Sequence, residues 1–113
     1  MLDPVAGNLE QYMTLLSVRQ KLVASNIANA DTPGYKTQDV DFQAELQNAG
    51  AGLGPTVQEV KGLTMKNDGN NVSLDRESRL LAENALRFNI ASNLLRSQLK
   101  IVRMAIEGGS TSS

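Results

Sequence analysis

Apolar residues recur at alternating spacings of four and three near both ends of the chain, whereas the middle shows neither this period nor strict alternation. Such spacing puts apolar residues on one face of a helix. In the first helix, expected over residues 3–31, that face consists of Leu9, Met13, Leu16, Gln20, Val23, Ile27 and Ala30. Asp3 and Pro4 favour a helix start. Pro33 favours a stop, because it biases Thr32 away from helical angles.

The period near the C-terminus runs without a break and predicts a helix over about residues 74–107. Its apolar face consists of Leu81, Ala85, Phe88, Ser92, Leu95, Leu99, Val102 and Ile106. A second row widens this face on one side, with Leu80, Leu94, Ile101 and Ala105. Ser73 or Asp75 is the expected cap at the start, and Gly108 with Gly109 is the expected end.

Between these helices, residues 36–72 are rich in glycine and polar residues and are interpreted as a flexible arm whose order depends on partners. Within it, Val40, Phe42 and Leu46 are expected to form a short apolar turn of helix that docks on a neighbour. Residues 57–65 are a candidate strand. The predicted segments are 1–35 (N-terminal helix and Thr-Pro-Gly-Tyr turn), 36–72 (arm), 73–108 (C-terminal helix) and 109–113 (disordered tail).

The predicted fold class is mostly α, with two long amphipathic helices in coiled-coil-like packing joined by a flexible, glycine-rich middle. One pair of helices buries a single stripe of each, so part of the wide C-terminal stripe stays exposed and favours association. In the alternative, residues 36–72 fold back over this stripe and make a small monomeric bundle. The expected helix-packing positions are Leu9, Met13, Leu16, Val23, Ile27, Leu81, Phe88, Leu95, Leu99, Val102 and Ile106.

Composition then narrows the chemistry. The 113-residue chain has no Cys, no His and a formal net charge of -1. Without Cys or His no nucleophile–base set can be assembled, and the carboxylate pairs Asp39/Asp41 and Asp75/Glu77 stand where solvation or the helix dipole explains them. We therefore expect no catalytic residue, no cofactor or metal site and no small-molecule substrate. The charge also lacks the basic footprint of nucleic-acid binding, so no nucleic-acid partner is expected.

The sequence carries no pattern for crossing or entering a membrane. No run approaches 18 apolar residues, the length expected of a spanning helix. The first ten residues lack a basic segment followed by an apolar one, so we expect no cleaved secretory signal. A chain of this kind that leaves the cytoplasm needs another route.

One motif stands at the end of the first helix. Residues 25–35 have the sequence Ser-Asn-Ile-Ala-Asn-Ala-Asp-Thr-Pro-Gly-Tyr, in which Pro33 and Gly34 fit the central positions of a type II turn. An Asn inside a helix costs about 0.6 kcal/mol relative to Ala, yet Asn26 and Asn29 stand three apart on one face. Either they mark a fraying helix end, or they form hydrogen bonds across a packed interface between helices.

This run resembles the signature of the flagellar basal-body rod family, the axial proteins that also include hook subunits. The signature positions, to which the resemblance assigns a role in assembly, are Ser25, Asn26, Ile27, Ala28, Asn29, Asp31, Thr32, Pro33, Gly34 and Tyr35. The segments 39–42 and 70–84, together with the short chain, resemble the proximal rod members. A sibling proximal rod protein or another axial subunit is the alternative. A soluble coiled-coil adaptor would explain the heptads but not the signature.

The resemblance implies a structural subunit that stacks helically in the proximal rod, transmits torque and lines a central export channel with its terminal helices. The implied partners are copies of itself, other rod subunits, the membrane-ring junction protein and the export gate. It also implies export by the flagellar type III apparatus without a cleaved signal, to the basal-body rod on the periplasmic side.

Overall fold

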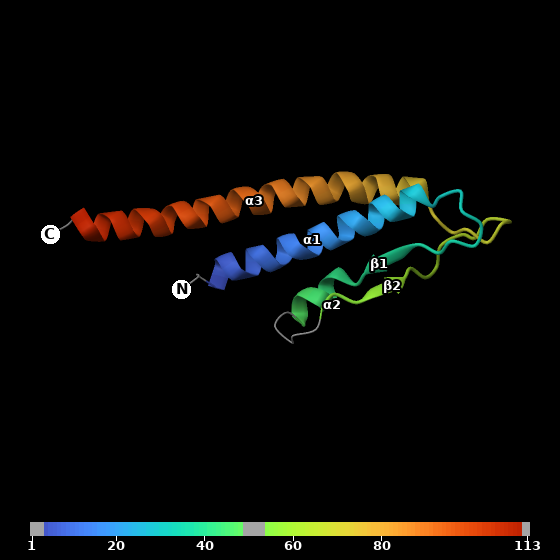
Figure 1. Ribbon diagram of the computed structural model, residues 1–113, viewed down its shortest axis with the longest axis horizontal. Coiled ribbons are helices and arrows are strands. Elements are labelled where there is room, and N and C mark those ends of the chain that lie inside the picture. The colour runs from blue at the N-terminus through green and yellow to red at the C-terminus, as the bar shows by residue number, and fades with distance from the viewer. Residues whose placement is uncertain (1–3, 49–53, 112–113) are drawn as a thin grey trace.

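A computed structural model describes residues 4–48 and 54–111 of the chain. The elements are α1 (Pro4–Ala28), β1 (Gln38–Val40), α2 (Phe42–Gln47), β2 (Val57–Glu59) and α3 (Leu74–Thr111). Helices α1 and α3 run antiparallel, and the chain between them folds along the side of α1 that faces away from α3 (Figure 1). The molecule is elongated, with principal extents of 73 × 27 × 17 Å. The predicted mostly helical fold with two long terminal helices is confirmed.

Helix α1 begins at Pro4, as its fixed φ favours, and the predicted cap Asp3 lies outside the described residues. The helix ends at Ala28, three residues before the predicted end. Ala30 N donates to Ile27 O (3.2 Å) and Thr32 N donates to Asn29 O (3.0 Å). These three-residue steps replace the four-residue step of an α-helix, so the last turn tightens before Pro33 is reached.

Helix α3 begins where the period predicts it. Ser73 rather than Asp75 is the cap, because Ser73 Oγ accepts from Arg76 N at 3.2 Å. The predicted end at Gly108 is wrong, since the helix continues to Thr111. Gly108 does not take the positive φ that ends helices at glycine, so nothing in its backbone stops the helix there.

The middle of the chain contains more regular structure than the arm predicted for it. Strands β1 and β2 pair antiparallel, with Gln38 opposite Glu59 and Val40 opposite Val57. The candidate strand at 57–65 is therefore realised over three residues only. Helix α2 begins at the cap Asp41, whose carboxylate accepts from a backbone N–H of the first turn. That the order of this segment depends on partners stays a prediction.

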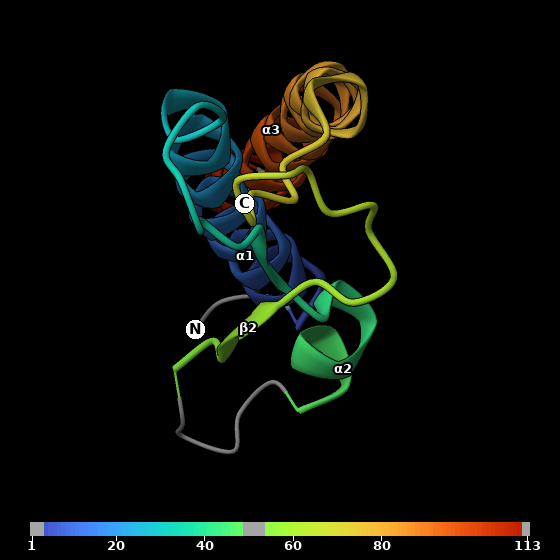
Figure 2. The same ribbon diagram turned by 90° about the vertical axis from the view of Figure 1, so that its right-hand side faces the viewer.

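The buried apolar core is small and centres on α1, which lies between α3 and the pair of strands (Figure 2). Its members are Leu15, Leu16, Val23, Ala30, Val40, Val72 and Ala91. Across the part of the chain that the structure describes, no helix is both long and apolar enough to cross a membrane.

Candidate functional site

The first part of the candidate site is the side of α3 that α1 leaves uncovered. Against α1 the structure buries Glu77, Asn84 and Ala91, which follow one another in steps of seven residues. The predicted packing row lies beside this one. Its side chains Leu81, Phe88, Leu99, Val102 and Ile106 are 37%, 37%, 46%, 41% and 68% exposed, and Leu95 is half-buried. These six residues, called the α3 seam below, are open to contact from outside the chain.

In α1 the predicted packing positions lie closer to the interior. Leu16 and Val23 are buried, and Leu9, Met13 and Ile27 are half-buried. The predicted row of α1 therefore packs in the core of this subunit, whereas the row predicted on α3 contributes little to that core.

The two residues predicted to dock on a neighbour pack within their own chain. Val40 is buried. The half-buried ring of Phe42 meets Tyr12 edge to face, with centroids 5.4 Å apart, and the guanidinium of Arg19 lies 5.6 Å from its centroid. Only the exposed part of Phe42 is left for another subunit, and docking there stays a prediction.

The second part of the candidate site is a buried polar cluster, called the polar joint below, formed by Arg19, Asn26, Asp39, Arg76 and Glu77. Asn26 is at its centre and is 1% exposed. Its amide nitrogen donates to Glu77 Oε1 on α3 and to the Gln38 carbonyl on β1 (2.9 Å). Its amide oxygen accepts from Gln38 N (3.0 Å) and from the Tyr35 hydroxyl (3.2 Å). One side chain thus connects α1, β1, α3 and the turn.

Two carboxylates and two guanidinium groups complete the polar joint. Asp39 accepts from Arg19 Nε (3.1 Å) and Nη2 (3.0 Å) and from Arg76 Nη2 (2.7 Å). Arg76 Nη1 also donates to Glu77 Oε2 at 2.6 Å, and the Glu77 side chain is fully buried. The four charges cancel, and each carboxylate has a cationic partner, as buried charges require.

This arrangement changes the acid–base properties of two groups. Burial alone would raise the pKa of the Asp39 carboxyl, but hydrogen bonds from Arg19, the Val40 N–H and Arg76 outweigh it, so that pKa lies below its ordinary value of 3.8. Burial alone would lower the pKa of Arg76, but its hydrogen bonds to Asp39 and Glu77 raise it. Both groups therefore stay charged at neutral pH, so the ion pair between them is present there.

A loop far along the chain closes the C-terminal end of α1. Asn70 Nδ2 donates to Asn29 O (2.9 Å) and to Thr32 O (2.8 Å). Lys66 Nζ donates to Ala30 O at 3.2 Å. These three carbonyls lie just beyond the last residue of α1, so the loop fixes the path of the chain as it leaves the helix.

The Thr-Pro-Gly-Tyr turn has the predicted form. Tyr35 N donates to Thr32 O at 3.2 Å, and Gly34 has a φ of 76°, as the third residue of a type II turn requires. A second left-handed glycine, Gly69, lies against it. A Cβ added at Gly69 would stand 3.4 Å from Gly34 Cα, so the two turns pack at one end of the molecule.

The two signature asparagines have separate roles within the chain. Asn29 Nδ2 donates to Ser25 O on its own helix (2.9 Å), and its side-chain oxygen accepts from Thr32 Oγ1 (3.1 Å). That matches the helix-end interpretation. Asn26 does bond between helices, but to α3 of the same chain. A direct role of either residue between subunits stays a prediction.

The remaining signature residues lie nearer the surface of the same end. Ser25 Oγ lies 3.2 Å from the Tyr35 hydroxyl, within hydrogen-bond distance. Ile27 is half-buried. The exposed members are Ser25, Ala28, Asp31, Thr32, Pro33 and Gly34.

The sequence interpretation of the carboxylates needs correction. Solvation or the helix dipole does not explain Asp39 and Glu77, which are buried and bonded in the polar joint. Asp75 is exposed near the start of α3, and Asp41 caps α2, so those two fit the expectation. Among residues 4–48 and 54–111 the structure has no group of three or more side chains suited to hold a metal ion.

Several residues of this site carried no assigned role from sequence. Asn84 Nδ2 donates to Leu16 O at 2.8 Å and Gln20 Oε1 at 3.1 Å, which ties α3 to α1 a second time. Their spacing was the available signal, because Glu77 and Asn84 stand one heptad apart and so share one face of α3. Asn70, Arg76 and Glu77 also belong to the segment whose resemblance to proximal rod proteins was noted.

Comparison with known proteins agrees with these features. A family model described as flagella basal body rod protein matches residues 13–36, which contain the signature. The Flagellar basal body rod protein FlgB of Salmonella typhimurium is 32% identical over 96% of this chain and 96% of its own length. Proteins of the same name are 30% identical in Escherichia coli, over 96% and 99% of the two chains, and 31% identical in Borrelia hermsii, over 86% and 91%.

The fold and the matched signature define the class as the flagellar basal body rod proteins, structural subunits of the flagellum. The chain belongs to the FlgB family within that class. It is thus a structural component of the basal body that associates with other components of it.

Proposed function

We propose that this rod subunit assembles helically through the α3 seam, and that its terminal helices line a central export channel and transmit torque. The main observation behind this proposal is that five side chains of the α3 seam are 37% to 68% exposed. Helix α1 packs against a different row of α3. An exposed apolar row favours association, because burying it removes apolar surface from water.

The polar joint supports this proposal from inside the subunit. A subunit that transmits torque needs its two helices at a fixed angle. Satisfied buried polar networks make a fold rigid and specific, and Asn26 links both helices to β1. In this view the signature shapes the subunit, and the α3 seam, with the exposed part of Phe42, contacts its neighbours.

The family membership supports a more specific setting for the subunit. We expect it in the proximal rod on the periplasmic side, in contact with copies of itself, other rod subunits, the membrane-ring junction protein and the export gate. It would reach this place through the flagellar type III apparatus without a cleaved signal. Its role there would be structural, with no catalytic step.

The test compares two single substitutions on α3. Leu99→Asp puts a charge in the seam, where burial without a partner costs several kcal/mol. Asn93→Asp adds the same charge at an exposed position on the polar side of the same helix. In a strain that lacks the native protein, we expect Leu99→Asp to be absent from purified basal bodies and the cells not to swim. Asn93→Asp should incorporate normally.

Each variant should also keep the helix content of the unaltered chain in circular dichroism, because both positions are exposed in the subunit. Normal incorporation of Leu99→Asp would exclude the seam as the assembly surface. Absence of the unaltered chain from basal bodies would exclude the proposed setting altogether.

A further inference from the structure

One row of buried or half-buried positions on each long helix repeats every seven residues. The row of α1 consists of Leu9, Leu16 and Val23, and the row of α3 consists of Glu77, Asn84, Ala91 and Gln98. If α3 moved along α1 by seven residues, about 10 Å at 1.5 Å per residue, the same two rows would face each other again. The heptad repeat by itself therefore permits more than one register of the two helices.

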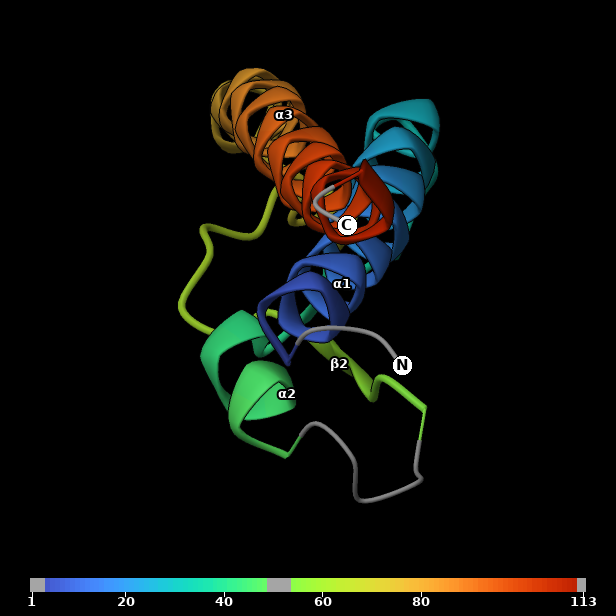
Figure 3. The ribbon, with the colours of Figure 1, turned by 90° about the vertical axis from the view of Figure 1, so that its left-hand side faces the viewer.

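In one shifted register, α1 would cover apolar side chains that it leaves open in the structure. Helix α3 extends past the start of α1, as Figures 1 and 3 show, and residues 99–108 are all exposed. If α3 moved one heptad toward the C-terminal end of α1, Leu99 and Val102 would take the places of Ser92 and Leu95. Those two places are half-buried, whereas Leu99 and Val102 are 46% and 41% exposed. The burial of apolar surface favours this shift.

Two polar side chains of the α3 row oppose the shift, because each is bonded at one place on α1. Glu77 Oε1 accepts from Asn26 Nδ2, and Asn84 Nδ2 donates to Leu16 O at 2.8 Å. In the shifted register Asn84 would face Asn26, and Ala91 would face Leu16 O. The side chain of Ala91 has no donor for that carbonyl. Both hydrogen bonds between the helices would therefore be lost.

Gln98 opposes the shift in a different way. It is half-buried in the structure and would move into the place of Ala91, which is 1% exposed. A buried amide costs free energy unless it finds hydrogen-bond partners, and an alanine site does not require them. The three polar residues of the row thus distinguish two registers that the heptad repeat permits.

We propose that Glu77, Asn84 and Gln98 select the register of α1 and α3, and that this register keeps Leu99 and Val102 of the α3 seam open. With apolar residues in their places, α3 would slide by one heptad and close this part of the seam against its own α1. Single buried polar residues select the register of coiled coils in this way, at a cost in stability. The inference rests on the proposed function, because an open seam matters only to a subunit that assembles through it.

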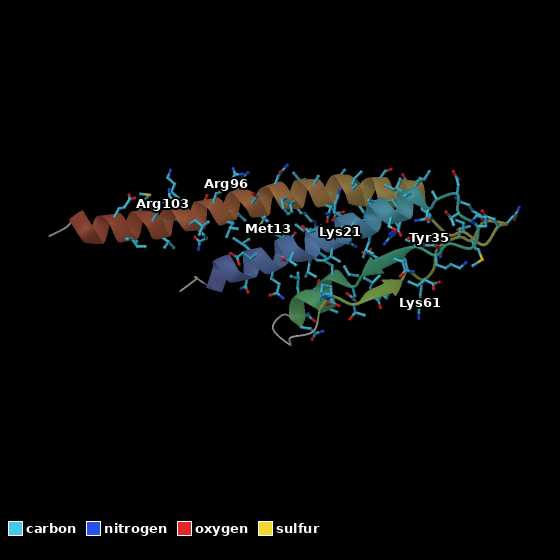
Figure 4. The ribbon with its side chains drawn as sticks, in the orientation of Figure 1. Met13, Lys21, Tyr35, Lys61, Arg96 and Arg103 are labelled. Carbon is cyan, nitrogen blue, oxygen red and sulfur yellow. The ribbon has the colours of Figure 1, made fainter. Side chains whose placement is uncertain are left out.

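The experiment measures the register in the full-length chain. Spin labels are attached at Lys21→Cys on α1 and at Arg103→Cys, which lies on α3 past the start of α1 (Figure 4). Both positions are exposed, and the chain has no cysteine of its own. Pulsed electron paramagnetic resonance then gives the distance between the labels. We expect one narrow distribution in this chain. In Glu77→Leu with Asn84→Leu and Gln98→Leu, we expect a maximum that is shorter by about 10 Å.

A matched triple variant is the control. Glu83→Leu with Asn93→Leu and Ser97→Leu places three leucines at exposed positions of α3 and should leave the distance unchanged. An unchanged distance in the first triple variant would overturn the proposal. A broad distribution with reduced helix content would also overturn it, because the three residues would then hold the helices together rather than select their register. So would a broad distribution in the chain without leucine substitutions, since one subunit would then not fix the register.

The link to assembly has its own measurement. The first triple variant should be at least tenfold depleted from purified basal bodies relative to the control variant, and equal incorporation would overturn that link. The distance measurement needs no basal body, so the register proposal and the proposed function can fail separately.

Discussion

The two parts of α3 differ in what they bury. Along α1, in residues 74–98, the polar side chains Glu77 and Asn84 are buried and bonded to α1. In residues 99–108, which extend past the start of α1 (Figure 1), the apolar side chains are exposed and none of these ten residues is buried. Two of the three side chains that α3 buries are therefore polar, whereas its large apolar side chains stay exposed where another subunit is proposed to bind.

This difference follows from what each kind of contact does best. Buried polar groups lose water and must find partners in one geometry, so they specify an arrangement at some cost in stability. Apolar contacts are non-directional and supply most of the free energy of association. A subunit whose shape must be fixed before assembly therefore benefits from buried polar contacts in its interior and from apolar contacts on its outer surface. Four comparisons of variants test this difference, beginning with the one expected to change stability most.

Two leucine substitutions compare the interior with the exposed C-terminal part of α3. Leu16 is 1% exposed, so Leu16→Ala should lower the free energy of unfolding by about 2–5 kcal/mol. Leu99 is 46% exposed, so Leu99→Ala should lower it by less than about 1 kcal/mol while reducing incorporation into basal bodies. Urea denaturation followed by circular dichroism measures both. Equal losses would mean that Leu99 packs within the chain. If the unaltered chain shows no cooperative transition, its ordered part forms only in the rod.

The two signature asparagines provide the second comparison. Asn26→Ala removes the partner of the Gln38 backbone, of Glu77 and of the Tyr35 hydroxyl. Each buried group left unpaired costs about 1–3 kcal/mol, so we expect a loss of roughly 2–4 kcal/mol in urea denaturation. Asn29→Ala loses bonds at a helix end only and should change stability by less than about 1 kcal/mol. A stable, more helical Asn26→Ala that fails to assemble would assign Asn26 to contacts between subunits.

The third comparison concerns the turn. Gly34 has a φ of 76° and open space around it, so Gly34→Val should cost about 1–3 kcal/mol through backbone strain alone. Gly54 also has open space but no positive φ, which makes Gly54→Val the matched control. Thermal denaturation should separate the two variants. Similar stability for both would mean that the turn relaxes without affecting the packing behind it.

The smallest effect is that of acid on the polar joint. The pKa of Asp39 lies below its ordinary value of 3.8 in the folded chain, so its contribution to stability is fully present above that value and is lost as pH falls through the lower folded pKa. The groups that face it are Arg19 and Arg76, with Glu77 beyond Arg76. The stability difference between the unaltered chain and Asp39→Asn, measured in urea, should therefore shrink below pH 3.8. A difference that stays constant down to pH 2 would show that Asp39 does not titrate with unfolding.

Local pattern was sufficient for the parts of the fold that depend on neighbours in sequence. The four-three spacing of apolar residues predicts both long helices, because a helix repeats every 3.6 residues whatever it packs against. The turn at residues 32–35 was likewise predictable, because proline fixes one φ and glycine permits a positive one. The signature at residues 25–35 identified the family. Each of these depends on residues only a few positions apart.

Tertiary structure alone decided which side chains meet. Asn26 and Glu77 are 51 residues apart, and Asn84 lies 68 residues from Leu16, so no local period relates them. Glu77 looked like a solvated residue of the first helical turn, yet it is buried, because the antiparallel register of α1 and α3 places it opposite Asn26. The same register leaves the α3 seam uncovered, since one helix can cover only one row of another. Sequence therefore determined the two long helices, the turn at residues 32–35 and the family to which the chain belongs. The pairing of the helices determined which faces became interior and which stayed open.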